Sequence, residues 1–331
     1  MRSVFDYERW KMHRSSSRYL RHVAGLPDSR IAAGLVKPLA YVASVSLAVM
    51  AYNLLVEAGK LPLWPILNVA ANAPFGLTSF ALSLLLVFRT NASYSRFDEA
   101  RKLWGLIVNK SRDLVRLAEG YLSPNQSEIK AAVARWTVAY TKALMCHVRE
   151  GEQLEQEVAN TLRPEELAAL MKATHRPLYC CQVLTSLLRQ AQLGPPTGKS
   201  GLEHGAGPQD YIPAMASFRM DEGVGTFTDV AGACERLLRT PIPLSYTRHT
   251  SRFMMIWLTL LPFTLWTACR WAMLPVALIV SFLLLGIEEI GVTIEEPFSI
   301  LPLEAICRTI EGNVAEVHGF GPGVQASPLA A

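Results

Sequence analysis

One stripe of side chains in this sequence combines residue types and a spacing that could serve ion transport. Phe80, Leu84 and Phe88 follow one another at i, i+4 intervals, so on a helix they lie within about 80° of one another. Asn91 and Ser95 continue the stripe with side chains that can donate hydrogen bonds. A stripe that turns from apolar to polar suits the lining of a pore, but ordinary packing between helices also produces an apolar stripe. The spacing leaves both interpretations open.

The helix that would carry this stripe begins near Asn72, a residue type that caps helices, with Pro74 in its first turn. Amide N–H groups in the first turn have no partner inside the helix and carry partial positive charge. If the stripe lines a pore, the segment from Asn72 to Phe75 would attract anions at its outer mouth. Asn91 and Ser95 would then donate hydrogen bonds in its inner vestibule.

Acidic residues collect toward the carboxyl end of the chain, where the last apolar run finishes. Arg89 lies about 100° around the helix from Phe88, so we expect it to pair with Glu288 or Glu289 rather than to touch ions. For the acids as a group we expect structural salt bridges with the basic middle region; they are Glu288, Glu289, Glu295, Glu296 and Glu304.

Signs of enzymatic, metal or redox chemistry are at chance level, so we predict no enzyme, no cofactor and no metal site. No HxxxH or HExxH spacing occurs among the histidines, which are His13, His22, His147, His175, His204, His249 and His318. No CxxC spacing occurs among the cysteines, which we expect to be reduced, buried and structural; they are Cys146, Cys180, Cys181, Cys234, Cys269 and Cys307. A net charge of +4 is too small to predict nucleic-acid binding.

The composition indicates an integral membrane protein. Half of the 331 residues are hydrophobic (50%), only 18% are charged, and the mean hydropathy is +0.21. The apolar residues concentrate in runs of about a bilayer's thickness. We predict four membrane-spanning helices, in which the stripe belongs to the second; the other apolar runs are Pro38–Val56, Phe253–Cys269 and Trp271–Ile287.

The charges beside these runs predict their orientation. The connector 57–72 is almost neutral, whereas the flanks outside the first two spans are rich in Lys and Arg. The amino terminus and the region after Arg89 should therefore share the positive side of the membrane. The basic segment 1–37, with its interleaved aromatic residues, suits a membrane surface. Its acids Asp6 and Glu8 argue against a transit peptide, so if the protein is imported into an organelle we expect that peptide to precede this sequence.

The middle of the chain is predicted to be helical and water-exposed. Helical patterns and stop signals delimit 98–121, 127–149, 164–173, 177–193 and 215–239. The residues 194–210 have the composition of a flexible loop. The chain thus divides into a basic segment (1–37), two spans (38–95), a helical soluble region (96–240), two further spans (241–294) and an acidic segment (295–331).

Three motifs, in order along the chain, carry a resemblance to a known family. They are FRTNASYSRFDEARKLWG from Phe88, PIPLSYTRHTSRF from Pro241 and IEEIGVTIEEPFSILPLEAI from Ile287. Together they resemble the bestrophin family, and most of all its chloroplast branch of thylakoid voltage-dependent chloride channels. The resemblance covers residues 5 to 313.

The resemblance implies an all-α membrane protein with four transmembrane helices per subunit, a helical stromal region, and five identical subunits around a central pore. Carried over residue by residue, the family's hydrophobic neck falls on Phe80, Leu84 and Phe88. The middle residue is Leu instead of an aromatic, which implies a wider neck. The family's second constriction would fall near Met215.

The resemblance also bears on calcium. Animal bestrophins hold calcium in an acidic run after an Asn-Pro-Phe sequence, and only Glu296 and Glu304 remain near the expected places here. Residues without carboxylates stand at the other positions, namely Ser299, Ile300, Leu301, Pro302 and Leu303. Calcium takes six to eight oxygen ligands. We therefore expect no calcium site and gating that does not depend on calcium.

The function implied is the passage of chloride, and of bicarbonate or nitrate, across the thylakoid membrane, with membrane lipid and other copies of the chain as partners. The family branch is named for voltage dependence, yet no span has an arginine at every third position, as a voltage sensor does. Voltage dependence would then arise from ion occupancy or from packing in the neck. The alternative is a membrane-anchored scaffold that does not conduct and whose helical region binds a stromal partner.

Overall fold

A computed structural model describes residues 5–26, 29–61, 64–68, 72–193 and 214–319. All regular secondary structure in these ranges is helical, which confirms the predicted fold class. The chain contacts divide it into two compact units. We call residues 5–98 together with 241–297 the span unit, and the described part of 99–240 together with 298–319 the extension unit.

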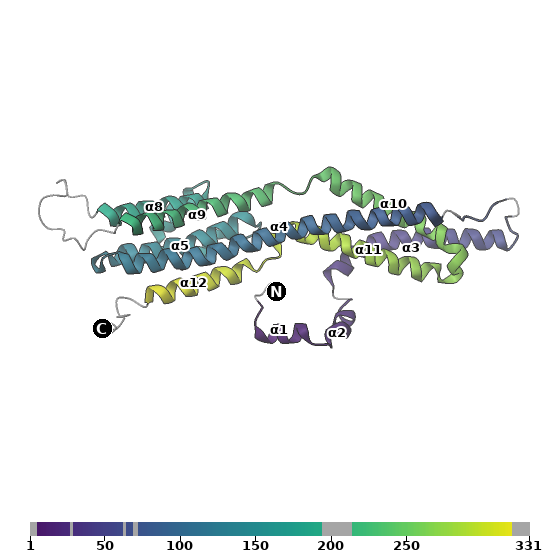
Figure 1. Ribbon diagram of the computed structural model, residues 1–331, viewed down its shortest axis with the longest axis horizontal. Helices are drawn as coiled ribbons and strands as arrows, with labels where there is room; N and C mark the ends of the chain where they lie inside the picture. The colour runs from purple at the N-terminus through teal and green to yellow at the C-terminus, as the bar shows by residue number, and fades with distance from the viewer. Residues whose placement is uncertain (1–4, 27–28, 62–63, 69–71, 194–213, 320–331) are drawn as a thin grey trace, which may run out of the picture. The chain divides into compact units, whose positions relative to one another are not determined.

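The span unit holds the apolar helices. Three stretches are long and apolar enough to cross a membrane, namely Arg30–Glu57, Phe75–Tyr121 and Leu244–Glu295. The third folds back on itself at a 3-10 turn, Arg270–Ala272, into the antiparallel helices α10 (Leu244–Cys269) and α11 (Met273–Glu295) (Figure 1). With α3 (Arg30–Glu57) and the first part of α4 (Asn72–Tyr121), four helices stand where four spans are predicted.

Local signals explain where these helices begin and end. The Ser29 hydroxyl accepts a hydrogen bond from the backbone N–H of Ala32 at 3.4 Å, so α3 starts at Arg30, before the predicted start at Pro38. Pro243 precedes the first residue of α10, which starts well before the predicted Phe253. At the far end of α10, Arg270 adopts φ +48°, and this left-handed residue reverses the chain into α11.

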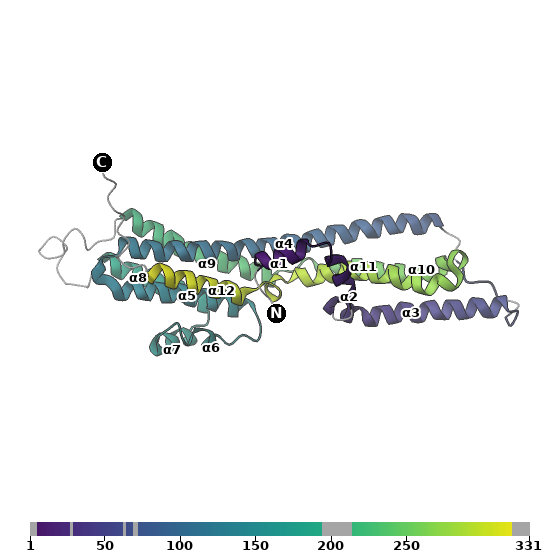
Figure 2. The ribbon, with the colours of Figure 1, turned by 90° about the horizontal axis from the view of Figure 1, so that it is seen from below.

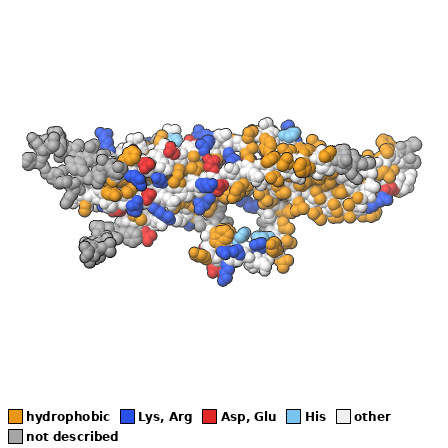
Figure 3. All heavy atoms as spheres, viewed as in Figure 1, with side chains coloured by type: hydrophobic (Ala, Val, Ile, Leu, Met, Phe, Trp, Pro, Cys, Tyr) orange, Lys and Arg blue, Asp and Glu red, His pale blue; other side chains and the backbone are white. Residues whose placement is uncertain are grey.

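The core of the span unit is formed by α3, α4, α10 and α11. It contains Leu35, Val42, Leu82, Leu86, Met254, Trp257, Leu258, Leu261, Ala277 and Leu285. The Phe75 ring stacks on Trp257 with 4.4 Å between ring centroids. Large hydrophobic side chains also remain exposed on these helices, and the surface over them is mostly hydrophobic in Figure 3. Such a surface is expected where lipid or further subunits cover the helices.

The extension unit is built around α5 (Ser127–Val148). This helix packs against α8 (Arg176–Leu193) and α12 (Leu303–Gly319), and α8 packs against α9 (Ala214–Arg239) (Figures 1 and 2). Almost every residue of α5 from 132 to 145 is buried, as expected for a central helix. Its Tyr140 stacks on Phe227 of α9 at 4.4 Å.

The helices expected in the middle of the chain are present. They are the second part of α4, α5, α7 (Pro164–Lys172), α8 and α9. The short α6 (Leu154–Val158) and the carboxyl-terminal α12 have no counterpart among the predicted helices. The predicted loop 194–210 lies outside the described residues. The basic amino-terminal segment forms α1 (Tyr7–Arg14) and α2 (Arg18–Ala24), neither of which contains a buried residue.

Candidate functional site

Helix α4 has two contrasting faces within the span unit. One face is packed into the protomer, where Leu82, Leu86, Arg89 and Ser93 are at most 3% exposed. The opposite face carries the predicted stripe. There Phe80, Leu84 and Phe88 are 71%, 44% and 57% exposed. The stripe is therefore not part of the core of a single chain, and packing within the protomer does not explain it.

The polar continuation of the stripe is exposed as well. Asn91 and Ser95 both lie on the same uncovered side of α4 as Leu84. The hydroxyls nearer the start of the helix are satisfied locally. Ser79 and Ser83 donate to backbone carbonyls of their own helix, at 2.7 and 2.9 Å. Among the described contacts, Asn91 and Ser95 form no such hydrogen bond with a carbonyl of their own helix. Their polar groups therefore remain available at the end of the stripe that lies nearest the charged segment.

Arg89 points away from the stripe into the protomer. Its guanidinium pairs with the carboxylate of Glu288 on α11, and that carboxylate also accepts a hydrogen bond of 2.6 Å from the Ser251 hydroxyl on α10. Both charged residues are buried, with 1% and 9% exposure. The prediction that Arg89 pairs with an acid of the last span is confirmed. Together with Ser251 the pair joins three helices, and the charge of Arg89 is balanced within the chain and is not free beside the stripe.

The start of α4 lies at Asn72, as predicted. The Asn72 side chain is outside the described residues. The Phe75 ring is half-buried against Trp257, so only the backbone amides of the first turn could take the role predicted for this end of the helix. The residue expected near a second constriction, Met215, lies in the first turn of α9, and its side chain is also outside the described residues.

An arginine that the sequence does not single out organises the acidic turn after α11. In the extension unit, Arg149 Nε donates to the Phe298 carbonyl at 2.7 Å, and its terminal nitrogens donate to the Leu301 carbonyl and, at 2.6 Å, to the Glu304 carboxylate. The Arg149 side chain is only 4% exposed. Its partners lie about 150 residues away along the chain, so no spacing rule could have identified them.

The acidic residues near the carboxyl end of the chain have different partners. Glu304 forms the expected salt bridge with the basic middle region, through Arg149. Glu288 pairs instead with Arg89 of α4, while the Glu295 carboxylate accepts a hydrogen bond of 3.0 Å from the Ile242 backbone. All six cysteines are free, as predicted, but the prediction that all are buried is wrong for Cys146 and Cys269, which are only partly covered. A separate cluster of polar side chains in the extension unit consists of His147, His175 and Glu235, and it is described below.

The apolar helices of the span unit, their uncovered stripe and the attached helical extension define an α-helical membrane protein with several spans. Residues 9–316 match the family model described as Bacterial/Fungal Bestrophin protein. The chain belongs to the bestrophin family, as its three motifs predict.

Individual relatives agree with this assignment. The chain is 38% identical over 318 residues to voltage-dependent chloride channel 2, chloroplastic, of Arabidopsis thaliana, covering 95% of this chain and 73% of that protein. Identity is 35% over 318 residues to voltage-dependent chloride channel 1, chloroplastic, of the same plant, with the same coverage. The crystal structure of a bacterial Bestrophin homolog from Klebsiella pneumoniae matches with a TM-score of 0.73 and 26% identity, over 86% of this chain and 98% of that chain.

Proposed function

We propose that this chain is the subunit of an anion channel that conducts chloride, bicarbonate and nitrate across the thylakoid membrane of a chloroplast. Membership of the bestrophin family supports the channel, and the names of the two Arabidopsis relatives support chloride and the chloroplast. The observation that carries the proposal is the uncovered stripe of α4, which lies opposite a fully buried face of the same helix.

In this proposal five copies of the chain surround one axis, and each contributes its α4. Rings of Phe80, Leu84 and Phe88 then form a dry constriction in which an ion must lose part of its hydration shell. Gating occurs there by dewetting or by rotation of the side chains, and voltage acts on ion occupancy or on packing in the neck. Asn91 and Ser95 form the polar vestibule on the inner side, where their hydrogen-bond donors meet the ion.

Anion preference in this channel comes from dipoles and not from a ring of arginines. The charge of Arg89 is balanced by Glu288 within each protomer, so it contributes little net field to the pore. The free amides in the first turn of α4 supply partial positive charge at the outer mouth. Dipoles of this kind attract any small monovalent anion, which is why bicarbonate and nitrate pass together with chloride.

Gating in this channel is independent of calcium. The acidic turn after α11 is held by the guanidinium of Arg149, which takes up two backbone carbonyls and the Glu304 carboxylate. Calcium binds carbonyl and carboxylate oxygens of this kind in proteins. Because the buried guanidinium of Arg149 already binds these oxygens, too few of them remain to coordinate a calcium ion.

The proposal is tested by reconstituting the purified protein in planar bilayers with unequal chloride concentrations. We expect single-channel currents that reverse near the equilibrium potential of chloride, and that persist when bicarbonate or nitrate replaces chloride on one side. Protein-free bilayers and a variant with altered neck residues separate this current from that of a contaminant. Absence of anion-selective current from the intact assembly would favour the scaffold that binds a stromal partner.

A further inference from the structure

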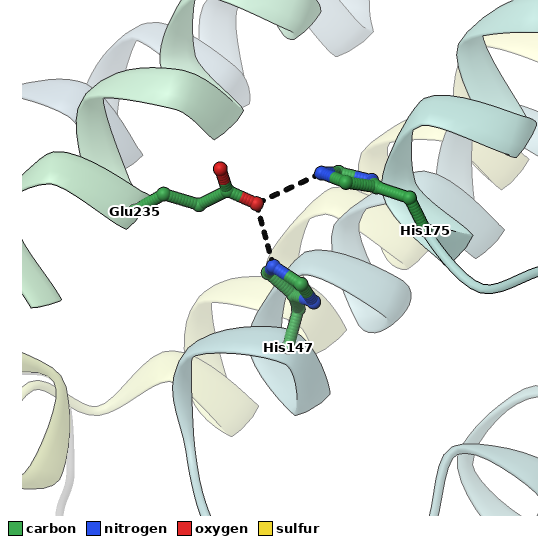
Figure 4. A group of neighbouring side chains, drawn as sticks. All are labelled: His147, His175 and Glu235. Carbon is green, nitrogen blue, oxygen red and sulfur yellow. Dashed lines mark hydrogen bonds and ion pairs between the residues drawn. The ribbon is translucent and has the colours of Figure 1, made fainter. Parts of the chain in front are cut away.

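Two imidazoles and one carboxylate converge in the extension unit, on residues that the proposed channel function does not use. His147 lies in the last turn of α5, His175 directly precedes α8, and Glu235 lies near the end of α9. The distance from Glu235 Oε1 is 2.6 Å to His147 Nε2 and 2.8 Å to His175 Nε2 (Figure 4). The two rings thus aim the same type of nitrogen at one oxygen atom of Glu235, one from the last turn of α5 and the other from the residue before α8.

We propose that His147, His175 and Glu235 form a binding site for a divalent transition-metal ion, with Zn²⁺ as the best match. Two imidazole nitrogens and one carboxylate oxygen are ligands that zinc accepts, whereas Ca²⁺ and Mg²⁺ favour oxygen ligands alone. Zinc with this ligand set keeps a water molecule in its fourth position. The side chains are 25%, 39% and 21% exposed, so an ion can enter and such a water can reach it.

The ligand atoms need only a small adjustment to hold the ion. All three lie within 4.8 Å of one another. Ligand bonds to zinc of about 2.1 Å in a tetrahedron place the ligand atoms roughly 3.4 Å apart. Since the present separations from the Glu235 oxygen are 2.6 and 2.8 Å, the carboxylate has to withdraw by less than an ångström. The mutual packing of α5, α8 and α9 holds the backbone that carries the ligands.

The protonation of His175 determines what metal binding displaces. Its Nδ1 accepts a hydrogen bond of 3.2 Å from the backbone N–H of Leu178, so the neutral ring carries its proton on Nε2 and donates it to Glu235. Binding a metal through Nε2 moves that proton to Nδ1 and gives up the bond to Leu178. This bond lies at an exposed helix start, where water can replace it.

The neighbouring thiols lie outside the group. Cys146 and Cys234 each stand next to a proposed ligand along the chain, but their sulfur atoms are not among the ligand atoms that lie within 4.8 Å of one another. The proposed site is therefore made of nitrogen and oxygen donors.

The test uses the full-length protein in detergent, purified without a polyhistidine tag and stripped with a chelator. Titration with Zn²⁺ in a calorimeter should show one ion bound per chain, together with a rise in melting temperature, and Ca²⁺ should produce neither effect. Co²⁺ should give the absorption bands of tetrahedral coordination. The variants His147→Ala, His175→Ala and Glu235→Gln should each lose the heat of zinc binding.

His318→Ala provides a matched control. His318 also contacts a carboxylate in the extension unit, through Nδ1 at 2.6 Å from Glu119, but no second imidazole completes that pair among the described residues. This variant should bind zinc as the unchanged protein does. Helical content by circular dichroism shows which variants fold. Absence of stoichiometric zinc binding in the unchanged protein, or its survival in folded His147→Ala, overturns the proposal, and neither outcome depends on whether the protein conducts.

Discussion

At the scale of single residues, burial around α4 separates two roles that share one helix. Arg89 and Glu288 are enclosed with Ser251 and hold helices together, whereas Phe80 and Phe88 are left uncovered by their own chain. A buried pair contributes little net stability, but removing one partner leaves an unpaired charge, at a cost of about 3–5 kcal/mol. Arg89 is thus a structural residue, and the exposed stripe is where changes should alter transport.

Replacing Phe80, Leu84 and Phe88 together with Ala should raise single-channel conductance severalfold and weaken any rectification. Each substitution removes apolar volume from the constriction, so the neck becomes wider and easier to wet. The measurement is current amplitude in planar bilayers at fixed chloride. Because these side chains are exposed in the protomer, the triple variant should keep its fold.

Ile256 and Ile279 supply the control for the neck variant. They are 60% and 61% exposed, as the stripe residues are, but they lie on α10 and α11. Replacing both with Ala should leave the conductance unchanged. If the two variants behaved alike, or if the neck variant left the current unaltered, the pore would have to be lined by other residues.

At the scale of elements, the turn between α11 and α12 depends on a side chain from the end of α5. Arg149 supplies donors to two carbonyls of this turn and to Glu304 while remaining nearly inaccessible to solvent. The geometry is set by the planar fork of the guanidinium, which an ammonium group cannot reproduce.

Arg149→Ala should destabilise the protein by about 1–3 kcal/mol for each buried carbonyl that loses its donor, because Phe298 and Leu301 then lack the guanidinium, whereas the Glu304 side chain, 36% exposed, can turn to water. Thermal melting in detergent measures the loss, and Arg149→Lys should recover only part of it. Arg163→Ala is the control. That arginine pairs with Glu128 on the surface, with 58% and 77% of the two side chains exposed, and its loss should leave the melting temperature unchanged.

The same turn provides the test of calcium independence. Addition of calcium or of a calcium chelator should change neither the melting temperature nor the current of the unchanged protein. A calcium-dependent rise in melting temperature that disappeared in Glu304→Gln would instead mean that the acidic turn binds the ion despite the presence of Arg149.

Elements whose signals are local could be predicted from the sequence. The helix start at Asn72, the period of the stripe and the position of Arg89 opposite it define α4 and its two faces. Contacts between distant segments had no such signal. His147, His175 and Glu235 meet only because α5, α8 and α9 pack together, and that packing is not encoded in any short spacing.

At the scale of the whole molecule, a single chain cannot be the functional unit that we propose. The uncovered stripe of α4 encloses nothing by itself, and a constriction requires copies of it around an axis. Closed rings of identical subunits are the usual solution for such assemblies. The family resemblance implies five.

Native mass spectrometry of the detergent-extracted protein should therefore give a particle of five times 36.6 kDa. Chemical cross-linking before extraction in detergent shows whether the chains already associate as pentamers in the membrane. A stable monomer or dimer under both conditions would contradict a central pore built from α4 and leave the stripe to face lipid.

The cation that holds the turn after α11 is a covalent part of the chain. Unlike a dissolved ion, it has no binding equilibrium with its surroundings, so its occupancy is constant whatever the concentrations outside. The channel that we propose therefore gives up one means of being switched, and any signal that opens or closes it has to arrive through another part of the protein.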